Sequence, residues 1–491
     1  MRLAQRAFNS SDQDRFASLS GDRNPMHMDA LKARRTQAGA PVVHGAHLLL
    51  WALDSLAATR PDLPKMRRIL CHFGKFVYLN ENVEVKIAEQ SPTKVRLNIS
   101  VDNISRSKAT IDFGDEREDC PVWYADCLQS VNVTPHALNL SFEDLGGRSG
   151  TVPFQMTEKQ SAGFFPSAVK WLGALPVASL AATTYLVGMV CPGLHSIFSS
   201  LTVTACRESS SAGGLAFRVT DTDPRFGSIE QEIAGGGLTG TVSAFFRSPP
   251  VKQATMDMLA GLVEPAEFAG SLALIVGGSR GLGELAAKLI AAGGGRVLIT
   301  WQSGKDEAEK VAEEIRAAGG ACETFAYDAR KSAAEQLAWL ADAPTHAYYF
   351  ATPAIFRQQS EIFSRERLKE FMAIYVDGFW QLAHALRSRQ PSLSIYYPSS
   401  ISVTERPKGM TEYTMAKAAG EVLCADMNVS LSPLRTFVSR LPRLSTDQTA
   451  SVTPVETASA LETMLPIVRE VQSWPGKVSV SAFNALRADK H

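Results

Sequence analysis

Hydrophobic and polar positions in the first 117 residues predict one buried helix followed by antiparallel strands. The run AGAPVVHGAHLLLWALDSLAA at 38–58 is apolar over the length of a helix and ends before Arg60-Pro61. Residues 83–87 and 95–101 instead alternate between apolar and polar, as half-buried strands do. The expected strands lie in FGKFVYL, NVEVKIAE, KVRLNISV and KATIDFG. A buried helix wrapped by an antiparallel sheet satisfies both patterns, so we expect an α+β domain at residues 1–117.

Residues 118–250 repeat this order of elements more weakly. LPVASLAATTYLVGMV at 175–190 takes the place of the first apolar helix, and strands are expected in SIFSSLTVTA, GLAFRVTD and GLTGTVSAFF. The copy lacks an acid and a histidine five residues apart ahead of its helix, a pair that the first half has. We therefore predict a second, degenerate domain of the same kind.

A different pattern begins after a proline-containing connector at 251–269. Residues 270–491 open with SLALIVGGSRGLGELAAKLIAAGGGRVLIT, which has the form strand, glycine turn, helix, strand. Strand–helix alternation continues from there, and this pattern is typical of an α/β, doubly wound parallel sheet.

Composition limits the classes of partner. A length of 491 residues suggests roughly three domains. The 50 basic residues balance the 50 acidic ones and form no long basic run, so nucleic acid is not an expected partner. The seven cysteines form no C-x-x-C pair, so we expect neither a disulfide framework nor a metal site. Reduced thiols, and an N-terminus without the apolar core of a signal peptide, favour a cytoplasmic protein.

The stretch from Trp171 to Ala205 contains no Asp, Glu, Lys or Arg and is long enough to span a bilayer. Its prolines and glycines, and the absence of a flanking basic cluster, favour another interpretation. A buried helix followed by a buried strand gives the same apolar run, so we expect no membrane span.

The segment SGDRNPMH carries the first candidate chemistry. Asp22 and His27 lie on a polar turn just before the apolar helix. A carboxylate and an imidazole held close together can bind one water molecule between them. One group then removes a proton, while the other orients the water or donates a proton. This suits the addition of water to a carbon–carbon double bond, or its removal. The helix start at His44-Gly45 offers backbone N–H groups and a positive dipole end that can hold charge on a neighbouring carbonyl.

SGDRNPMHMD followed by APVVHG resembles the (R)-specific enoyl-thioester hydratases, the MaoC-like branch of the hotdog fold, over about the first quarter of the chain. The resemblance implies that Asp22 and His27 are the catalytic acid/base pair, that Asn24 helps to place the water, and that the Gly45 N–H polarises the thioester carbonyl. His44 has either a role in catalysis or one in packing. The degenerate copy then forms the second wall of a double hotdog with one active site.

A glycine turn carries the second candidate chemistry. Gly277, Gly281 and Gly283 follow an apolar strand and open a helix, a setting in which the backbone approaches a dinucleotide pyrophosphate. The second strand ends in TWQSGK without the acid that would bind a ribose 2′-hydroxyl, and Arg280 in the turn can pair with a 2′-phosphate. NADPH is therefore favoured over NADH.

Tyr413 and Lys417 lie four residues apart, on one face of an expected helix. A lysine cation lowers the pKa of a nearby phenol, which then exchanges protons with a carbonyl or alcohol oxygen. Ser400, thirteen residues before the tyrosine at the end of an expected strand, can steady the same oxygen.

These residues resemble the short-chain dehydrogenase/reductase family, close to the 3-oxoacyl-thioester reductases, over about 270–450. Two departures from the family pattern are FATP at 350–353, in place of Asn-Asn-Ala-Gly, and Tyr375 in place of a relay asparagine. The resemblance implies a catalytic Ser400, Tyr413 and Lys417. It also implies cofactor contacts from Gly277, Ser279, Arg280, Gly281, Leu282, Gly283, Asp328, Tyr413 and Lys417.

Together the motifs predict an enzyme with two activities, a 3-oxoacyl-thioester reductase and a (3R)-hydroxyacyl-thioester dehydratase. It would use NADPH and act on acyl carrier protein or coenzyme A thioesters, and the reductase resemblance suggests a homo-oligomer. Two alternatives remain open. One is the oxidative direction of β-oxidation with NAD, and the other is a non-catalytic hotdog scaffold joined to a reductase.

Overall fold

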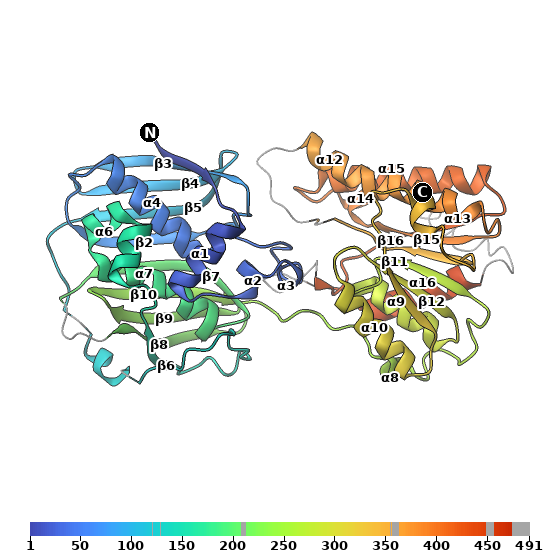
Figure 1. The fold of residues 1–491 in the computed structure, drawn as a ribbon, viewed down its shortest axis with the longest axis horizontal. Coiled ribbons are helices and arrows are strands. Elements are labelled where there is room, and N and C mark those ends of the chain that lie inside the picture. Colours follow the sequence, from blue (N-terminus) through green and yellow to red (C-terminus); the bar gives the residue numbers. More distant parts are fainter. Residues whose placement is uncertain are drawn as a thin grey trace, which may run out of the picture. The chain divides into compact units, whose positions relative to one another are not determined.

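The computed structural model describes residues 1–119, 121–127, 129–207, 213–353, 355, 363–447 and 456–473. The chain divides into two compact units, each with its own sheet (Figure 1). Unit 1 comprises Met1–Pro249, and unit 2 comprises Pro250–Thr449 together with the chain from Glu456 onward.

Unit 1 is built on a ten-stranded antiparallel sheet with the order β1-β3-β4-β5-β2-β7-β10-β9-β8-β6. Outward from the central β2–β7 pair, the two halves place corresponding strands in the same order. The strands are β1 (Arg2–Ala7), β2 (Met66–Phe73), β3 (Asn82–Ser91), β4 (Lys94–Val101), β5 (Ile104–Phe113), β6 (Ser149–Pro153), β7 (Ser196–Ala205), β8 (Gly214–Asp223), β9 (Ser228–Gly235) and β10 (Leu238–Phe246).

Helices cover one face of this sheet (Figure 1). They are α1 (Ser10–Ser20), α2 (Pro25–Met28), α3 (Ala30–Ala33), α4 (Gly45–Thr59), α5 (Glu158–Phe164), α6 (Pro166–Leu172) and α7 (Ala174–Tyr185), which continues as the π-helical turn η2 (Leu186–Val190). The short 3-10 helix η1 (Val122–Cys127) instead packs against Ala216 and Ala234, which point to the other face of the sheet. Helices α4 and α7 hold corresponding places in the two halves, each preceding the central strand of its half.

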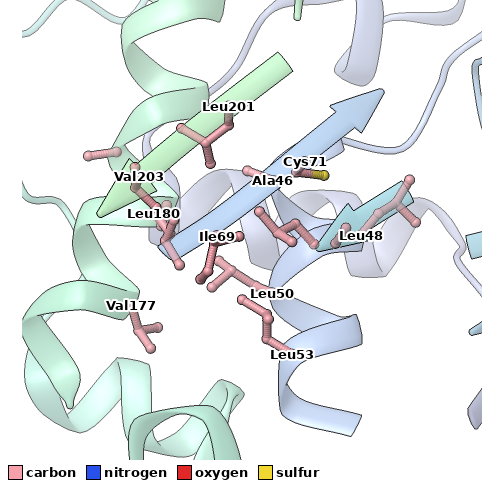
Figure 2. Packing of buried hydrophobic residues seen from close by; sticks show 14 of the residues in the cluster. Ala46, Leu48, Leu50, Leu53, Ile69, Cys71, Val177, Leu180, Leu201 and Val203 are labelled. Carbon is pink, nitrogen blue, oxygen red and sulfur yellow. The ribbon is translucent and has the colours of Figure 1, made fainter. Parts of the chain in front are cut away.

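The core of unit 1 lies where these two helices meet the central strands. Ile69 of β2 pairs with Val203 of β7, and side chains of α4 and α7 converge on this pair, among them Leu50 and Leu180 (Figure 2). Each fully buried side chain of this size contributes roughly 1.5–3 kcal/mol by leaving water. The two halves therefore share one core and one continuous sheet.

The strand expected in FGKFVYL is wrong, because β2 ends at Phe73 and the chain then leaves the ladder. The N–H groups of Gly74 and Lys75 both donate to the carbonyl oxygen of Arg106, at 2.9 and 3.0 Å. This shared acceptor turns the backbone away from the sheet. The apolar helix begins at Gly45 instead of residue 38, and strands β1, β2, β6 and β9 were not predicted from the pattern.

The uncharged run from Trp171 to Ala205 forms the end of α6 and then α7, η2 and β7, as the buried helix-and-strand interpretation predicts. Among the described residues, no single helix meets the length and hydropathy that a membrane span requires. The segments Pro166–Leu172 and Ala174–Val190 meet them only together, with a bend of 115° between them.

Unit 2 contains a six-stranded parallel sheet with the order β13-β12-β11-β14-β15-β16, which confirms the predicted doubly wound architecture. The strands are β11 (Leu272–Val276), β12 (Arg296–Trp301), β13 (Cys322–Ala326), β14 (His346–Tyr349), β15 (Ser394–Ser400) and β16 (Arg435–Leu441). The order reverses between β11 and β14, and in such sheets ligands bind outside the carboxyl ends of the strands at this point.

The helices of unit 2 lie on both faces of its sheet (Figure 1). They are α8 (Met256–Leu259), α9 (Gly281–Ala292), α10 (Lys305–Ala317), α11 (Ala333–Leu337), α12 (Arg365–Met372), the π-helical turn η3 (Ala373–Gly378), α13 (Phe379–Arg387), α14 (Ser402–Glu405), α15 (Thr411–Ser430) and α16 (Ala460–Gln472).

The segment 251–269, expected to be a connector, packs into unit 2. Its apolar residues Leu259, Val263 and Phe268 are buried in the core that surrounds α9. Arg469 of α16 also forms an ion pair with Glu267, at 2.6 Å. These contacts make the segment part of the folded unit.

Candidate active sites

The turn after α1 buries Asp22 completely and surrounds its carboxylate with donors. Oδ1 accepts the backbone N–H of Asn24 at 3.0 Å, and Oδ2 accepts the hydroxyl of Thr184 at 2.7 Å. Nε2 of His44 lies 3.1 Å from the Asp22 carbonyl oxygen and 3.8 Å from Oδ2. The acid of the first motif is thus held by residues from both halves of unit 1.

Asn24 anchors this turn to the second half of unit 1. Its side-chain oxygen accepts the N–H of Met26, which caps α2, and its amide donates to the carbonyl oxygens of Gly188 and Gly193 at 2.8 and 3.1 Å. We expected Asn24 to place a water. The structure instead shows this side chain engaged with backbone groups.

His27 lies on α2 and is partly exposed. Its Nδ1 is 2.8 Å from the carbonyl oxygen of Val42, so Nδ1–H donates there and Nε2 is the nitrogen left to act as a base. The ring stacks on His44 with centroids 3.9 Å apart and planes 27° apart. The structure therefore brings Asp22 and His27 together, with His44 beside both.

Asp22, His27 and His44 also form the one group of three possible metal ligands among the described residues, with their ligand atoms within 4.8 Å of one another. The lone pairs of stacked imidazoles lie in nearly parallel planes, and so they do not converge on a single ion. This arrangement favours proton transfer over metal binding.

Burial sets the charge states in this cluster. It raises the pKa of Asp22, while the charge of His27 and the hydrogen bonds from Thr184 and Asn24 act in the opposite direction. Burial, followed by the charges of neighbouring histidines, lowers the pKa of His44 well below its usual value, so His44 is neutral. A carboxylate that is costly to ionise beside an accessible imidazole is suited to acid/base work.

The start of α4 lies next to this cluster, because His44 is its N-cap residue and Gly45 its first residue. The first N–H groups of a helix have no partners within the helix. A Cβ on Gly45 would lie 3.0 Å from the ring of Phe73, which explains the glycine. The Gly45 N–H therefore lies in the first turn of α4, beside the cluster of Asp22, His27 and His44.

Sequence reasoning missed two residues of this site, Thr184 and Gly188. Gly188 lies in the π-helical turn η2, and a Cβ there would lie 2.6 Å from Oδ1 of Asp22. Both residues are more than 160 positions away in sequence. A β-branched residue and a glycine in an apolar helix give no local signal for such a contact.

The glycine turn in unit 2 joins β11 to α9. Gly277 and Gly281 have φ values of +83° and +59°, which favour glycine. A Cβ on Gly283 would lie 2.3 Å from the carbonyl oxygen of Gly277, so the helix packs directly on the turn. Ser279 is buried in this turn and Leu282 lies in the first turn of α9. The cradle and the helix N-terminus together fit a dinucleotide pyrophosphate.

The side chains expected to contact the rest of the cofactor are engaged with other residues. Arg280 forms an ion pair with Asp447 at 3.6 Å, and both carboxylate oxygens of Asp328 accept hydrogen bonds from Arg330 at 3.0 Å. Arg330 lowers the pKa of Asp328, which stays ionised. A 2′-phosphate at this turn would have to compete with Asp447 for Arg280.

Tyr413 and Lys417 lie on α15, and Ser400 ends β15. Burial raises the pKa of Tyr413, and a hydrogen bond with Ser400 opposes this shift. We expected Lys417 to lower the pKa of this phenol, but its Nζ donates to the carbonyl oxygen of Pro398 at 2.7 Å. Burial lowers the pKa of Lys417 to about 7.

Two known protein families match parts of this chain, one in each unit. Residues 2–109 match the MaoC like domain, and residues 271–452 match the short chain dehydrogenase family. The chain is therefore a fusion of a MaoC-like dehydratase domain with an oxidoreductase domain of the short-chain dehydrogenase family.

One curated relative is a 3-hydroxybutyryl-CoA dehydratase of Methylorubrum extorquens AM1. It is 29% identical over 151 residues, which cover 30% of this chain and 88% of the relative. Similar solved structures include a 3-oxoacyl (acyl-carrier-protein) reductase from Agrobacterium tumefaciens C58 with NADP bound, at 16% identity and a TM-score of 0.37, covering 42% of this chain and 88% of that one. A short chain dehydrogenase from Escherichia coli CFT073 complexed with NADPH is 18% identical, with a TM-score of 0.39 and coverages of 43% and 93%.

Proposed function

We propose that this chain reduces 3-oxoacyl thioesters to (3R)-hydroxyacyl thioesters with NADPH and interconverts these with trans-2-enoyl thioesters by loss or addition of water. The two reactions change the same β-carbon in succession. The observation that carries the proposal is the presence of two separate proton-transfer clusters in one chain, around Asp22 and His27 in unit 1 and around Tyr413 and Lys417 in unit 2.

In unit 1, Asp22 and His27 would hold the water, take one proton from it as its hydroxyl adds to the β-carbon, and deliver one proton to the α-carbon. In the reverse direction they would take the α-proton and protonate the leaving hydroxyl. The Gly45 N–H would stabilise negative charge on the thioester oxygen as the α-carbon gains or loses a proton. The hydrogen bonds from Thr184 and Asn24 support this role, because they keep the buried carboxylate oriented. Asn24 acts here by anchoring the turn.

Residues 118–250 would form a degenerate second hotdog beside the first hotdog at 1–117. The repeated strand order and the contacts of Thr184 and Gly188 with Asp22 support this division. It implies one hydratase site for each chain, and titration of two acyl-thioester sites in unit 1 would contradict it.

In unit 2, Tyr413 would give its proton to the 3-oxo oxygen, which Ser400 would steady, and Lys417 would support the phenol. When bound, NADPH supplies the hydride for the β-carbon. The glycine turn of Gly277, Gly281 and Gly283, with Ser279 and Leu282, would hold its pyrophosphate. Arg280 would bind the 2′-phosphate, and Asp328 would contact the adenine.

The oxidative alternative uses NAD and starts from the enoyl thioester. Arg280 in the turn, and the sequence TWQSGK where an acid would bind a ribose hydroxyl, favour NADPH and reduction. In the alternative of a non-catalytic scaffold, the buried Asp22 carboxylate would have no role, although residues from both halves of unit 1 hold it in place. The carrier is coenzyme A or acyl carrier protein, and the enzyme acts as a homo-oligomer in the manner of many short-chain reductases.

A panel of acyl thioesters tests this proposal. Purified protein should oxidise NADPH with acetoacetyl-CoA or its acyl carrier protein counterpart, and mass spectrometry should detect 3-hydroxybutyryl and then crotonyl thioester. Chiral analysis should give the (3R) product. Reduction without any dehydration supports the scaffold alternative, whereas a clear preference for NADH contradicts the cofactor assignment.

A further inference from the structure

Lys417 of unit 2 lies among three tyrosine rings. Its Nζ is 3.8 Å from the ring centroid of Tyr375, 4.9 Å from that of Tyr397 and 5.9 Å from that of Tyr413. Nζ donates one hydrogen bond to the carbonyl oxygen of Pro398, and the face of Tyr375 is the nearest of the three rings. The shortest of these contacts has the geometry of a cation–π interaction in a site closed to water.

The ring of Tyr375 is fixed in this orientation from several sides. Its hydroxyl hydrogen-bonds the Thr352 hydroxyl at 2.5 Å, so the polar end of the side chain is occupied away from Lys417. The ring stacks on Phe371, with planes 5° apart. The residue lies in the π-helical turn η3, where the hydroxyl of Tyr349 donates to the carbonyl oxygen of Ile374 at 2.7 Å.

Thr352 and Tyr375 are therefore in contact, and they stand at the two places where unit 2 departs from the pattern of its family. The two changes form one structural pair, with a hydroxyl contact on one side and a ring face toward Lys417 on the other.

We propose that Tyr375 is a positioning residue of the reductase site, whose ring face holds the Lys417 side chain and keeps it charged. This inference rests on the proposed reductase function, in which a charged Lys417 supports Tyr413. The hydroxyl of Tyr375 fixes the ring through Thr352 and takes no part in proton transfer.

The groups around Lys417 make its charge sensitive to this contact. Burial lowers its pKa to about 7, and Cys424 and Glu421 on the same helix act in the opposite direction. Glu421 is itself paired with Arg440 of β16, at 2.7 Å, and accepts a hydrogen bond from Ser399 of β15. Because Arg440 and Ser399 share the Glu421 carboxylate, this acid stabilises the charge of Lys417 less. The ring face of Tyr375 would then decide whether Lys417 is charged at neutral pH.

The phenols of this cluster stay neutral, because burial raises the pKa of Tyr375, Tyr397 and Tyr413. They therefore act on Lys417 through their ring faces and dipoles, without a full charge. A contact that favours the charged amine raises its pKa. Removing the negative ring face at position 375 should therefore move the titration of Lys417 to lower pH.

A fluorination series at position 375 tests the proposal, because all of its members lack the hydroxyl and keep an aromatic ring of similar size, so that they differ mainly in the charge on the ring face. Phenylalanine, 3,5-difluorophenylalanine and pentafluorophenylalanine are introduced there in the full-length chain, and the Lys417 amine is titrated by NMR with ¹⁵Nζ-labelled lysine. Its signal is assigned with Lys417→Met. The phenylalanine variant should titrate where the native chain does, and the pentafluoro variant should titrate roughly one pH unit lower.

The alkaline limb of NADPH-dependent acetoacetyl-CoA reduction should move with the amine titration. Phe371→Leu is the matched control, because it removes a ring that stacks on Tyr375 and leaves the ring that faces Nζ. Equal titration throughout the series, or an equal shift in Phe371→Leu, would overturn the inference. A graded shift in a protein that reduces no 3-oxoacyl thioester would instead count against the proposed function, because the amine titration does not depend on turnover.

Discussion

The hydroxyl of Thr184, on α7, donates a hydrogen bond of 2.7 Å to Oδ2 of Asp22, on the turn after α1. The two residues belong to different halves of unit 1. The half that lacks the acid–histidine motif thus supplies a direct contact to the acid of the other half. Its retention in the chain is explained by this contact as well as by the shared core.

Thr184→Val should impair the hydration of enoyl thioesters, although the side chain keeps nearly the same size and shape. The hydrogen bond favours the ionised carboxylate, so its loss should raise the pKa of Asp22 and move the acidic limb of the hydration profile to higher pH. We expect kcat/KM for crotonyl-CoA to fall about tenfold at neutral pH, the equivalent of one hydrogen bond to a charged group.

Thr183→Val is the control for this prediction. Thr183 is equally buried, and its hydroxyl donates to the carbonyl oxygen of Leu180 on its own helix. Equal losses in the two variants would mean that Thr184 acts through helix packing and has no special relation to Asp22.

Gly188→Ala should displace the Asp22 carboxylate. The added methyl group would lie 2.6 Å from Oδ1, so one of the two groups must move. We expect a loss of hydration of about 100-fold, typical of a misplaced catalytic group, with reduction by unit 2 preserved. In Gly163→Ala, by contrast, the new methyl group meets nothing within 4 Å among the described residues, and both activities should persist.

Asp22→Asn should make the protein more stable at neutral pH. Because burial raises the pKa of Asp22, the folded state holds this proton more tightly than the unfolded chain does. The free energy of unfolding therefore decreases as the pH rises above the ordinary carboxyl range, and the amide removes this decrease. Thermal unfolding of unit 1 should occur roughly 2–4 °C higher in the variant at pH 8. The difference should vanish near pH 4, and a variant that is less stable at pH 8 would show that the ionised carboxylate is favoured by the fold.

Arg280→Ala should weaken the binding of NADPH and leave the binding of NADH nearly unchanged. A lost ion pair with the 2′-phosphate should raise the KM for NADPH about tenfold or more and leave the KM for NADH within twofold. Arg296→Ala serves as the control, because Arg296 pairs with Asp342 on the surface of unit 2. Equal increases in the KM for both cofactors would mean that Arg280 maintains the shape of the turn and does not bind the 2′-phosphate.

Local motifs made much of the architecture predictable. Tyr413 and Lys417 are four residues apart, and helical geometry alone puts them on one face. Asp22 and His27 meet because a short turn joins them. The parallel sheet of unit 2 follows from the alternation of apolar strands with amphipathic helices, and this doubly wound architecture was confirmed, although the order of its strands was not predicted.

Contacts between distant segments were not predictable in this way. Thr184 and Gly188 reach Asp22 only because the central strands β2 and β7 pair and bring α7 beside the first turn. The pairing of Thr352 with Tyr375 depends likewise on packing between a loop and a helix. The run FGKFVYL does not form the expected strand, because the carbonyl oxygen of Arg106 on β5 accepts the N–H groups of Gly74 and Lys75.

The separation of the two sites is tested most directly by measuring both reactions in two single variants of the full-length chain. Asp22→Asn should abolish crotonyl-CoA hydration and leave NADPH-dependent reduction of acetoacetyl-CoA within twofold of the native rate. Tyr413→Phe should abolish the reduction and leave the hydration intact. Loss of both activities in either variant, or hydration that survives in Asp22→Asn, would contradict the account.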